Sequence, residues 1–254
     1  MKKSLIALAL VGVFAVPAFA EEAAPTPEHT LTGNLGLFTS YRFRGIDQTF
    51  GKPALQGGFD YSHSSGIYLG NWNSNVSQTA GYPDGNLEMD FYGGYKTTFG
   101  DFGLDVGGLY YYYPGSRGQT LGLNRGAVDN GELYIAGTWK FLTLKYSYAV
   151  TDYFSLPDSD GSSYLELNAA YDLGNGWGIN GHAGHLWLKN YSVGDYTDWK
   201  LGVTKDIGGF VIGLSYVDTN ADKTFYTSSA AMHSGGDTKN LGRATAVLSV
   251  SKTF

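Results

Sequence analysis

The sequence has no cysteine, little proline and, after its first 20 residues, no long apolar segment. The absence of cysteine excludes disulfides and thiolate chemistry. Without a further apolar run of ~18 residues, no transmembrane helix is expected in the rest of the chain. Basic residues are in the minority, with 17 Lys and Arg against 23 Asp and Glu, so no nucleic acid partner is expected. No phosphate-loop or dinucleotide fingerprint is present, and no cofactor is expected.

The N-terminus has the three parts of a secretory signal. Lys2 and Lys3 precede an apolar run from Leu5 to Val16, and the small-residue motif Ala18-Phe19-Ala20 follows. We expect residues 1–20 to be cleaved as a signal peptide. Residues 21–30 are polar and contain proline, which favours a flexible periplasmic leader. Residues 31–254 are then expected to form one domain.

The last stretch of the chain, Gly242 to Phe254, alternates between apolar and polar residues. Leu248 and Val250 share one side, while Ser249 and Ser251 share the other, which predicts a strand with two unlike faces. A strand that ends the chain must pair backwards, and the segment Leu31 to Arg44 alternates in the same way. First and last strands of matching kind predict a closed barrel, because closure removes the unpaired edges that lipid does not tolerate.

The same alternation recurs along the whole chain and predicts about twelve strands. The expected strands are Leu31 to Arg44, Pro53 to Ser62, Gly66 to Val76, Asn86 to Phe99, Phe102 to Tyr113, Gly131 to Phe141, Leu142 to Thr151, Ser163 to Leu173, Trp177 to Lys189, Tyr196 to Lys205, Gly209 to Asp218 and Gly242 to Phe254. These lengths suit a tilted strand, since ~9–11 residues cross the hydrocarbon core. The predicted fold class is therefore all-β, a transmembrane antiparallel β-barrel.

The connections between the predicted strands alternate in length. The short ones are His63 to Ser65, Gly100-Asp101, the Phe141/Leu142 junction, Gly174 to Gly176 and Asp206 to Gly208. The long ones are Gly45 to Lys52, Ser77 to Gly85, Pro114 to Asn130, Asp152 to Ser162, Asn190 to Asp195 and Thr219 to Leu241. Short periplasmic turns and long extracellular loops are the layout of outer-membrane barrels. A secreted β-sandwich, the other all-β reading, is not expected to keep this alternation.

Aromatic residues follow the same polarity and predict two interfacial belts. Beside the short turns lie Phe99, Phe102, Phe141, Trp177, Phe210 and Phe254. Toward the long loops lie Tyr41, Phe43, Tyr110, Tyr112, Tyr148, Trp187 and Trp199. Two such belts around an apolar band are typical of a barrel that crosses a membrane.

Between Phe38 and Val76 the sequence resembles the TorF-type porin family of proteobacterial outer-membrane proteins. The matching residues are Tyr41-Arg42-Phe43-Arg44-Gly45, Gln48, Pro53-Ala54, Gln56 to Tyr61, Gly70 and Trp72 to Val76. The resemblance is dense over the first three predicted strands and is one of pattern over the rest. It implies a barrel and a pore, and it supplies no substrate.

Nearly every charged residue on the predicted strands falls on the polar, inward face, which makes these residues the candidate pore lining. The set is Arg42, Arg44, Asp60, Glu88, Asp90, Lys96, Asp105, Glu132, Lys140, Lys145, Glu166, Asp198, Lys200 and Arg243. A Lys or Arg facing lipid at mid-membrane would cost ~2–4 kcal/mol, so this segregation indicates a charged lumen. Lys252 is the exception, on the apolar face near the chain end.

The expected depths of these residues suggest two arrangements. If the first and last strands pair, Arg42, Arg44 and Arg243 form a basic wall opposite acids such as Glu88 and Glu132, and a transverse field orients solutes. Alternatively, the charges pair into a network that braces or plugs the barrel. Twelve strands give a backbone radius of about 12 Å, between filled and freely conducting barrels. The loop Pro114 to Asn130, with Arg117 and Arg125, is long enough to fold inward or to cover the mouth.

The sequence predicts an outer-membrane porin of a Gram-negative bacterium for passive diffusion of small hydrophilic solutes. Its expected partners are outer-membrane lipid and lipopolysaccharide, the barrel-assembly machinery through the strand ending in Phe254, and the solutes. The alternative is a non-conducting barrel whose long loops have a surface-binding or lipase-like enzymatic function. In this alternative His185, beside Trp187, faces lipid. No Ser-His-Asp spacing accompanies it, so neither an enzyme nor a metal site is expected. The solute, ion selectivity, gating and oligomeric state stay open.

Overall fold

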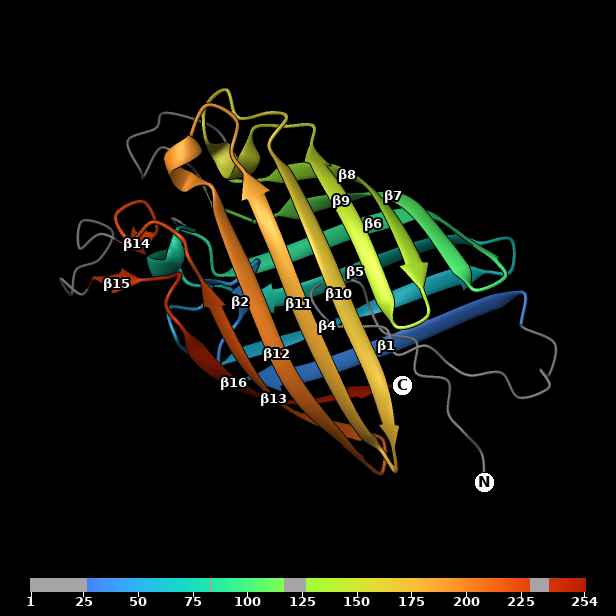
Figure 1. The fold of residues 1–254 in the computed structure, drawn as a ribbon. Helices are drawn as coiled ribbons and strands as arrows, with labels where there is room; N and C mark the ends of the chain where they lie inside the picture. The colour runs from blue at the N-terminus through green and yellow to red at the C-terminus, as the bar shows by residue number, and fades with distance from the viewer. Residues whose placement is uncertain (1–26, 83, 117–126, 229–237) are drawn as a thin grey trace.

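A computed structural model describes residues 27–82, 84–116, 127–228 and 238–254. The expected signal peptide, the leader up to residue 26, and Arg117 and Arg125 lie outside these residues. Within them, twelve strands form one closed antiparallel barrel (Figure 1). The barrel strands are β1 (His29–Phe38), β4 (Ala54–His63), β5 (Ile67–Asn75), β6 (Leu87–Phe99), β7 (Phe102–Tyr112), β8 (Asn130–Trp139), β9 (Leu142–Ala149), β10 (Ser163–Gly174), β11 (Trp177–Trp187), β12 (Tyr196–Ile207), β13 (Phe210–Thr219) and β16 (Thr245–Thr253).

The barrel closes between its first and last strands, as the sequence predicts. β1 pairs with β16 from Asn34 opposite Thr253 to Phe38 opposite Ser249. The backbone of Phe254 extends this seam, since its N–H donates to the Gly33 carbonyl at 2.8 Å. Every barrel strand therefore has a neighbour on both sides, and the described part of the sheet has no open edge.

Short turns and long connections lie at opposite ends of the barrel. The long connections lie at one end of the barrel (upper left in Figure 1). They include two small sheets, one of β2 (Arg42–Phe43) and β3 (Ile46–Asp47) and one of β14 (Thr227–Ser228) and β15 (Lys239–Asn240). The 3-10 turns η1 (Gln78–Ala80), η3 (Tyr153–Ser155) and η4 (Ser192–Gly194) belong to the same connections. The alternation of short and long connections predicted from the sequence is confirmed.

Most predicted strand ends lie within two residues of those in the structure, and three differences affect the interpretation. β1 stops at Phe38 and does not reach Arg44, because the chain bends at Thr39 and Ser40. Arg44 and Gly45, with positive φ of 46° and 78°, form the turn of the β2–β3 hairpin. β16 begins at Thr245 and not at Gly242. β8 and β9 do not meet directly: Lys140, with a φ of 54°, and Phe141 form a two-residue turn between them.

The outward face of the barrel is apolar and exposed. Large side chains such as Leu37, Phe59 and Leu69 are more than half exposed to the surroundings, which in water would form an unusually large apolar patch. Lys252, on this face, lies against the ring of Phe210 with its Nζ 4.4 Å from the centroid. No helix in the described residues is long and apolar enough to span a membrane.

The inward face is filled at the long-connection end and polar toward the short turns. Two buried clusters occupy the filled end. One is mostly aromatic, lies around Tyr41, Trp72 and Tyr111, and reaches Tyr68 toward the short turns; the other mixes aliphatic and aromatic side chains around Tyr164 and Tyr196. The predicted outer aromatic belt is therefore wrong in two members: Tyr41 and Phe43 pack inside the barrel, because the segment that carries them leaves the wall after Phe38. Tyr110, Tyr148, Trp187 and Trp199 do face outward.

Candidate functional site

Residues 39–53, the first long connection, fold into the lumen, and we call them the inserted segment. Its side chains and backbone contact strands far around the ring. The Tyr41 hydroxyl donates to Glu88 Oε1 of β6 at 2.9 Å, and the Tyr196 hydroxyl of β12 donates to the Arg44 carbonyl at 2.8 Å. Because β6 and β12 are separated by several strands on either side, the segment crosses the barrel interior.

Arg44 is the central contact of the inserted segment. Its Nη1 and Nη2 donate to the two oxygens of Glu132 on β8 at 2.9 and 2.8 Å, and Nη1 also donates to the Tyr153 hydroxyl at 3.0 Å. The side chains of Arg44 and Glu132 are only 7% and 2% exposed. Burial works to lower the pKa of Arg44, but the adjacent Glu132 carboxylate raises it well above its ordinary value. The guanidinium stays charged and is held in a bidentate pair.

The base of the inserted segment is held by a second buried ion pair. Asp47 Oδ2 lies 2.9 Å from Lys239 Nζ and 3.5 Å from Arg42 Nη2. Arg42 also donates to the Leu241 carbonyl at 2.9 Å and to the Thr245 hydroxyl at 2.8 Å. Burial works to raise the pKa of Asp47, but the Arg42 charge and the Lys239 hydrogen bond outweigh it and lower the pKa below its ordinary value. The carboxylate is therefore ionised at neutral pH.

The wall beside the inserted segment carries two fully buried carboxylates. Glu88 and Asp90 of β6 are 1% and 0% exposed. Glu88 accepts the hydrogen bond from Tyr41, whereas neither oxygen of Asp90 has a hydrogen-bond partner among the described residues. Asp90 is bracketed in the sheet by Trp72 and Tyr111. The filled half of the lumen thus holds more carboxyl groups than basic groups.

The half of the lumen nearer the short turns is lined by carboxylates and a lysine that are partly exposed. Asp60 of β4 accepts from the Tyr92 hydroxyl at 2.5 Å. Asp105 of β7 accepts from the Tyr68 hydroxyl at 2.6 Å and lies 3.6 Å from Lys96 Nζ. The Lys96 side chain is 47% exposed, so this pair is solvated and weak.

A hydrogen-bond network lines the other side of the lumen, on β10, β11 and β12. His182 Nε2 lies 2.9 Å from Asp198 Oδ1 and 3.0 Å from the Tyr164 hydroxyl, which donates to Asp198 Oδ2 at 2.7 Å. His182 Nδ1 lies 2.7 Å from Asn168 Oδ1, and Asn168 donates to Glu166 Oε2 at 2.9 Å. Lys145 faces Glu166 across the β9–β10 pair, and Lys200 follows Asp198 by two positions on the same face.

The predicted pore-lining residues therefore fall into three groups. Those on the inward face of barrel strands are Asp60, Glu88, Asp90, Lys96, Asp105, Glu132, Lys145, Glu166, Asp198 and Lys200. Arg42 and Arg44 also lie in the interior, but on the inserted segment and not on the wall.

The last two predicted lining residues lie outside the lumen. Lys140 is exposed in the β8–β9 turn, where its left-handed backbone leaves the strand. Arg243 is exposed before the start of β16, and its carbonyl accepts from Arg42 at 3.3 Å. The basic wall predicted from Arg42, Arg44 and Arg243 is wrong, because Arg44 extends to the far side and pairs with Glu132.

Several lumen residues were not singled out from the sequence. Trp72, Tyr92 and Tyr164 share the inward parity of the predicted charges, and the same alternation identifies them once aromatics are included. The insertion of residues 39–53 had a weaker signal, the apolar Ile46 and Phe50 in a stretch expected to be a polar loop. His185 points outward beside Trp187 with ring centroids 4.3 Å apart, as predicted, whereas His182 points inward.

An apolar cavity lies beside the inserted segment. Its volume is about 240 Å³, and its lining includes Phe43, Tyr153, Phe154, Phe225 and Tyr226. The cavity separates the inserted segment from the connections that cover the barrel end, so the packing of the filled half is incomplete there.

Comparison with solved structures finds outer-membrane porins. The structure described as KdgM porin in complex with disordered oligogalacturonate is 8% identical, with a TM-score of 0.52, and the match covers 88% of this chain and 97% of that chain. NanC porin is 9% identical, with a TM-score of 0.51, and the match covers 89% and 99%. Such low identity establishes a shared fold and nothing finer.

Comparison by sequence gives a family. None of the curated proteins compared with this chain matches it. A family pattern matches residues 22–254, which include all twelve strands of the barrel. The chain therefore belongs to the family described as "Bacterial protein of unknown function (Gcw_chp)".

Proposed function

We propose that this protein is an outer-membrane porin through which small hydrophilic solutes diffuse. The observation that carries the proposal is the segregation of side chains across a closed barrel wall: apolar residues face out, and charged residues face in. Lipid tolerates only such a wall, and a charged interior serves water-soluble solutes. The porin folds of the structural neighbours and the resemblance to TorF-type porins support the same assignment.

The inserted segment would form the constriction of this channel. It crosses the interior at the level of Glu88 and Glu132, whereas the half nearer the short turns is polar and partly open to solvent. Porins restrict passage by such an inward-folded loop, with charges on the loop and the facing wall setting selectivity. Here the loop charge, Arg44, is already neutralised by Glu132.

The remaining lumen charges favour cations. Among the described residues, the acids of the interior are Asp47, Asp60, Glu88, Asp90, Asp105, Glu132, Glu166 and Asp198, and the bases are Arg42, Arg44, Lys96, Lys145, Lys200 and Lys239. An acidic lumen raises the local concentration of cations. The acidic oligosaccharide named for KdgM porin is therefore a poor guide to the solute of this chain.

The proposed location is the outer membrane of a Gram-negative bacterium, with the short turns on the periplasmic side. The apolar outward face would contact lipid and lipopolysaccharide, and the last strand, ending in Phe254, would be the segment that the barrel-assembly machinery recognises. Immunodetection after fractionation of inner and outer membranes tests the location. A chain found in the periplasmic fraction would contradict it.

The second candidate is a non-conducting barrel, and one observation favours it: aromatic clusters and the inserted segment fill the long-connection half. Single-channel recording of the refolded protein in a planar bilayer distinguishes the two. Discrete conductance steps with a cation preference under a salt gradient are expected for the porin. If a protein with the circular dichroism of a folded barrel gives no conductance steps, the function would instead be assigned to the long connections. The outward His185 would then be tested for the lipase-like alternative.

A further inference from the structure

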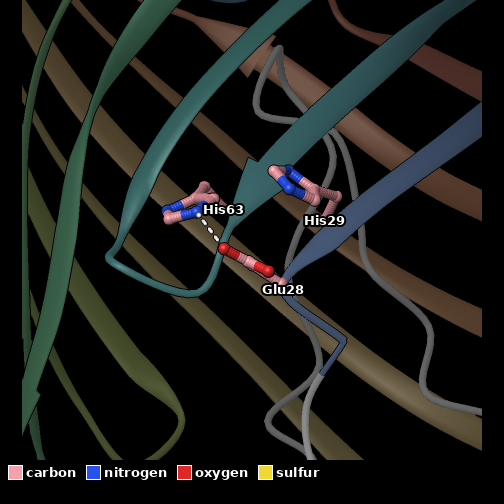
Figure 2. A group of neighbouring side chains, drawn as sticks. All are labelled: Glu28, His29 and His63. Carbon is pink, nitrogen blue, oxygen red and sulfur yellow. Dashed lines mark ion pairs between the residues drawn. The ribbon is translucent and has the colours of Figure 1, made fainter.

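A separate cluster of side chains lies at the short-turn end of the barrel, where β1 begins and β4 ends. Glu28, His29 and His63 each offer one ligand atom, and these atoms lie within 4.8 Å of one another (Figure 2). His29 and His63 are direct cross-strand partners, with ring centroids 5.1 Å apart. The Glu28 carbonyl accepts the Ser64 N–H at 2.9 Å, which ties Glu28 to the turn after β4. The backbone therefore holds all three residues together.

In both His29 and His63, one ring nitrogen makes a hydrogen bond, which leaves the other nitrogen available to a metal ion. His29 Nδ1 lies 2.8 Å from the Tyr61 hydroxyl, and His63 Nδ1 lies 2.7 Å from the Ser65 hydroxyl. When these oxygens accept the Nδ1 proton, Nε2 carries the free lone pair. Metal-binding histidines are typically held in this way through their second nitrogen. His63 Nε2 already lies 3.6 Å from Glu28 Oε1.

The Ser65 backbone N–H also lies 3.1 Å from His63 Nδ1, and this contact belongs to the other tautomer. In that tautomer Nδ1 accepts, and the Nε2 proton faces Glu28. A metal ion bound at Nε2 takes the place of this proton and selects the tautomer in which the Ser65 hydroxyl accepts.

We propose that Glu28, His29 and His63 form a Zn²⁺ site on the outside of the barrel at its short-turn end. Two imidazoles and one carboxylate, with a position left for water, are a ligand set that Zn²⁺ accepts. At a tetrahedral zinc with ~2.1 Å bonds the ligand atoms lie roughly 3.4 Å apart, so separations of up to 4.8 Å must contract by up to about 1.4 Å. The Glu28 side chain is 73% exposed and has room to move inward.

The bound ion would join the residue before β1 to the last residue of β4. This would fasten the first strand at the point where the chain enters the barrel, on a surface separate from the lumen. The site does not depend on conduction: a barrel without channel activity would still bind the ion, and a conducting barrel without the site would still conduct.

The test is titration of Zn²⁺ into untagged, refolded protein that has been treated with a chelator, followed by isothermal titration calorimetry. The wild type is expected to bind one equivalent. The double variant His29→Ala/His63→Ala is expected to lose this binding. Tyr61→Phe removes the hydroxyl partner of His29 Nδ1 and is expected to weaken binding roughly tenfold while keeping both histidines. Glu28→Gln, which preserves shape, is expected to weaken it as well.

His185→Ala is the matched control, because His185 is also an outward histidine but lies on β11, far along the sheet. It is expected to bind Zn²⁺ like the wild type. Circular dichroism of each variant checks that the barrel has formed. A wild type that binds no Zn²⁺, or a folded double variant that binds with unchanged affinity, would overturn the proposal.

Discussion

Arg44 is the residue whose removal should disturb the lumen most. It is buried, and Glu132 balances its charge through two short hydrogen bonds. Arg44→Gln leaves a buried carboxylate without its counter-ion, and loss of one partner of such a pair costs about 3–5 kcal/mol. We expect a corresponding fall in the free energy of unfolding, measured by urea titration of the protein in lipid vesicles with tryptophan fluorescence.

The double variant Arg44→Gln/Glu132→Gln is the informative comparison. It removes both charges, so it is expected to regain most of the stability lost in the single variant. Lys140→Gln, in an exposed turn, serves as the control and is expected to change the unfolding free energy by less than about 0.5 kcal/mol. Equal stability of Arg44→Gln and wild type would show that the pair does not hold the inserted segment.

Asp47 gives the base of the inserted segment a pH dependence. Its pKa is lower in the folded than in the unfolded chain, so its carboxylate contributes stability above its ordinary pKa of 3.8, and this contribution disappears as the pH falls through the lowered value. Wild type should therefore exceed Asp47→Asn in unfolding free energy at about pH 6, and the difference should shrink toward about pH 3. A difference that is constant across this range would contradict the ionised Asp47.

At the residue scale, the alternation of side chains predicts which strand charges face inward but not which partner each charge finds. Asp60, Glu166 and Asp198 lie on the predicted face because their neighbours on the strand are apolar. The pairing of Arg44 with Glu132 joins positions 88 residues apart. It depends on a segment crossing the interior, and no local pattern contains that information.

The inserted segment is the element that should control passage through the barrel. Phe38 and Ala54, which flank it, are direct partners in the β1–β4 pair. Residues 39–53 can therefore be replaced by a two-residue Asn-Gly turn without separating the strands. We expect the single-channel conductance of this variant to rise severalfold, because the segment no longer obstructs the interior.

The matched control changes a turn at the other end of the barrel. Replacing Lys140 and Phe141, a two-residue turn already, by Asn-Gly leaves the lumen contacts intact and is expected to leave the conductance unchanged. Equal conductance of wild type and the variant without the segment would show that the segment is not the narrowest part of the path.

At the element scale, strand positions were predictable and strand ends less so. The period-two pattern continues through Tyr41 and Phe43, which gave a first strand that was too long. The chain bends out of the wall at Thr39 and Ser40, and Arg42–Phe43 pair with Ile46–Asp47 through the turn at Arg44 and Gly45. The His29 and His63 pairing was missed for a related reason, since residues 21–30 were expected to lie outside the barrel, whereas β1 begins at His29.

For the whole molecule, the excess of acids over bases in the lumen predicts a preference for cations. Under a salt gradient the reversal potential of the wild type should have the sign of cation selectivity. Asp60→Asn/Asp105→Asn removes two partly exposed acids of the polar half and is expected to move the reversal potential toward zero. These two carboxylates accept from Tyr92 and Tyr68, and an amide oxygen still accepts those bonds.

Lys140→Gln is again the control, because it removes a charge outside the lumen. Its reversal potential should equal that of the wild type. Anion selectivity of the wild type, or a double variant that is more cation-selective, would show that Lys96, Lys145 and Lys200 dominate the path.

Barrel closure was the most predictable property of the whole molecule, because it follows from a requirement of the membrane and from two similar strands at the chain ends. Closure between the first and last strands makes the final step of folding slow. The seam joins Asn34 to Thr253, and these residues are separated by almost the entire chain. Contacts so distant in sequence form slowly. Until β16 pairs with them, β1 and β13 both have an unpaired edge. Open edges recruit other chains, so the unassembled protein should depend on chaperones during its passage to the membrane.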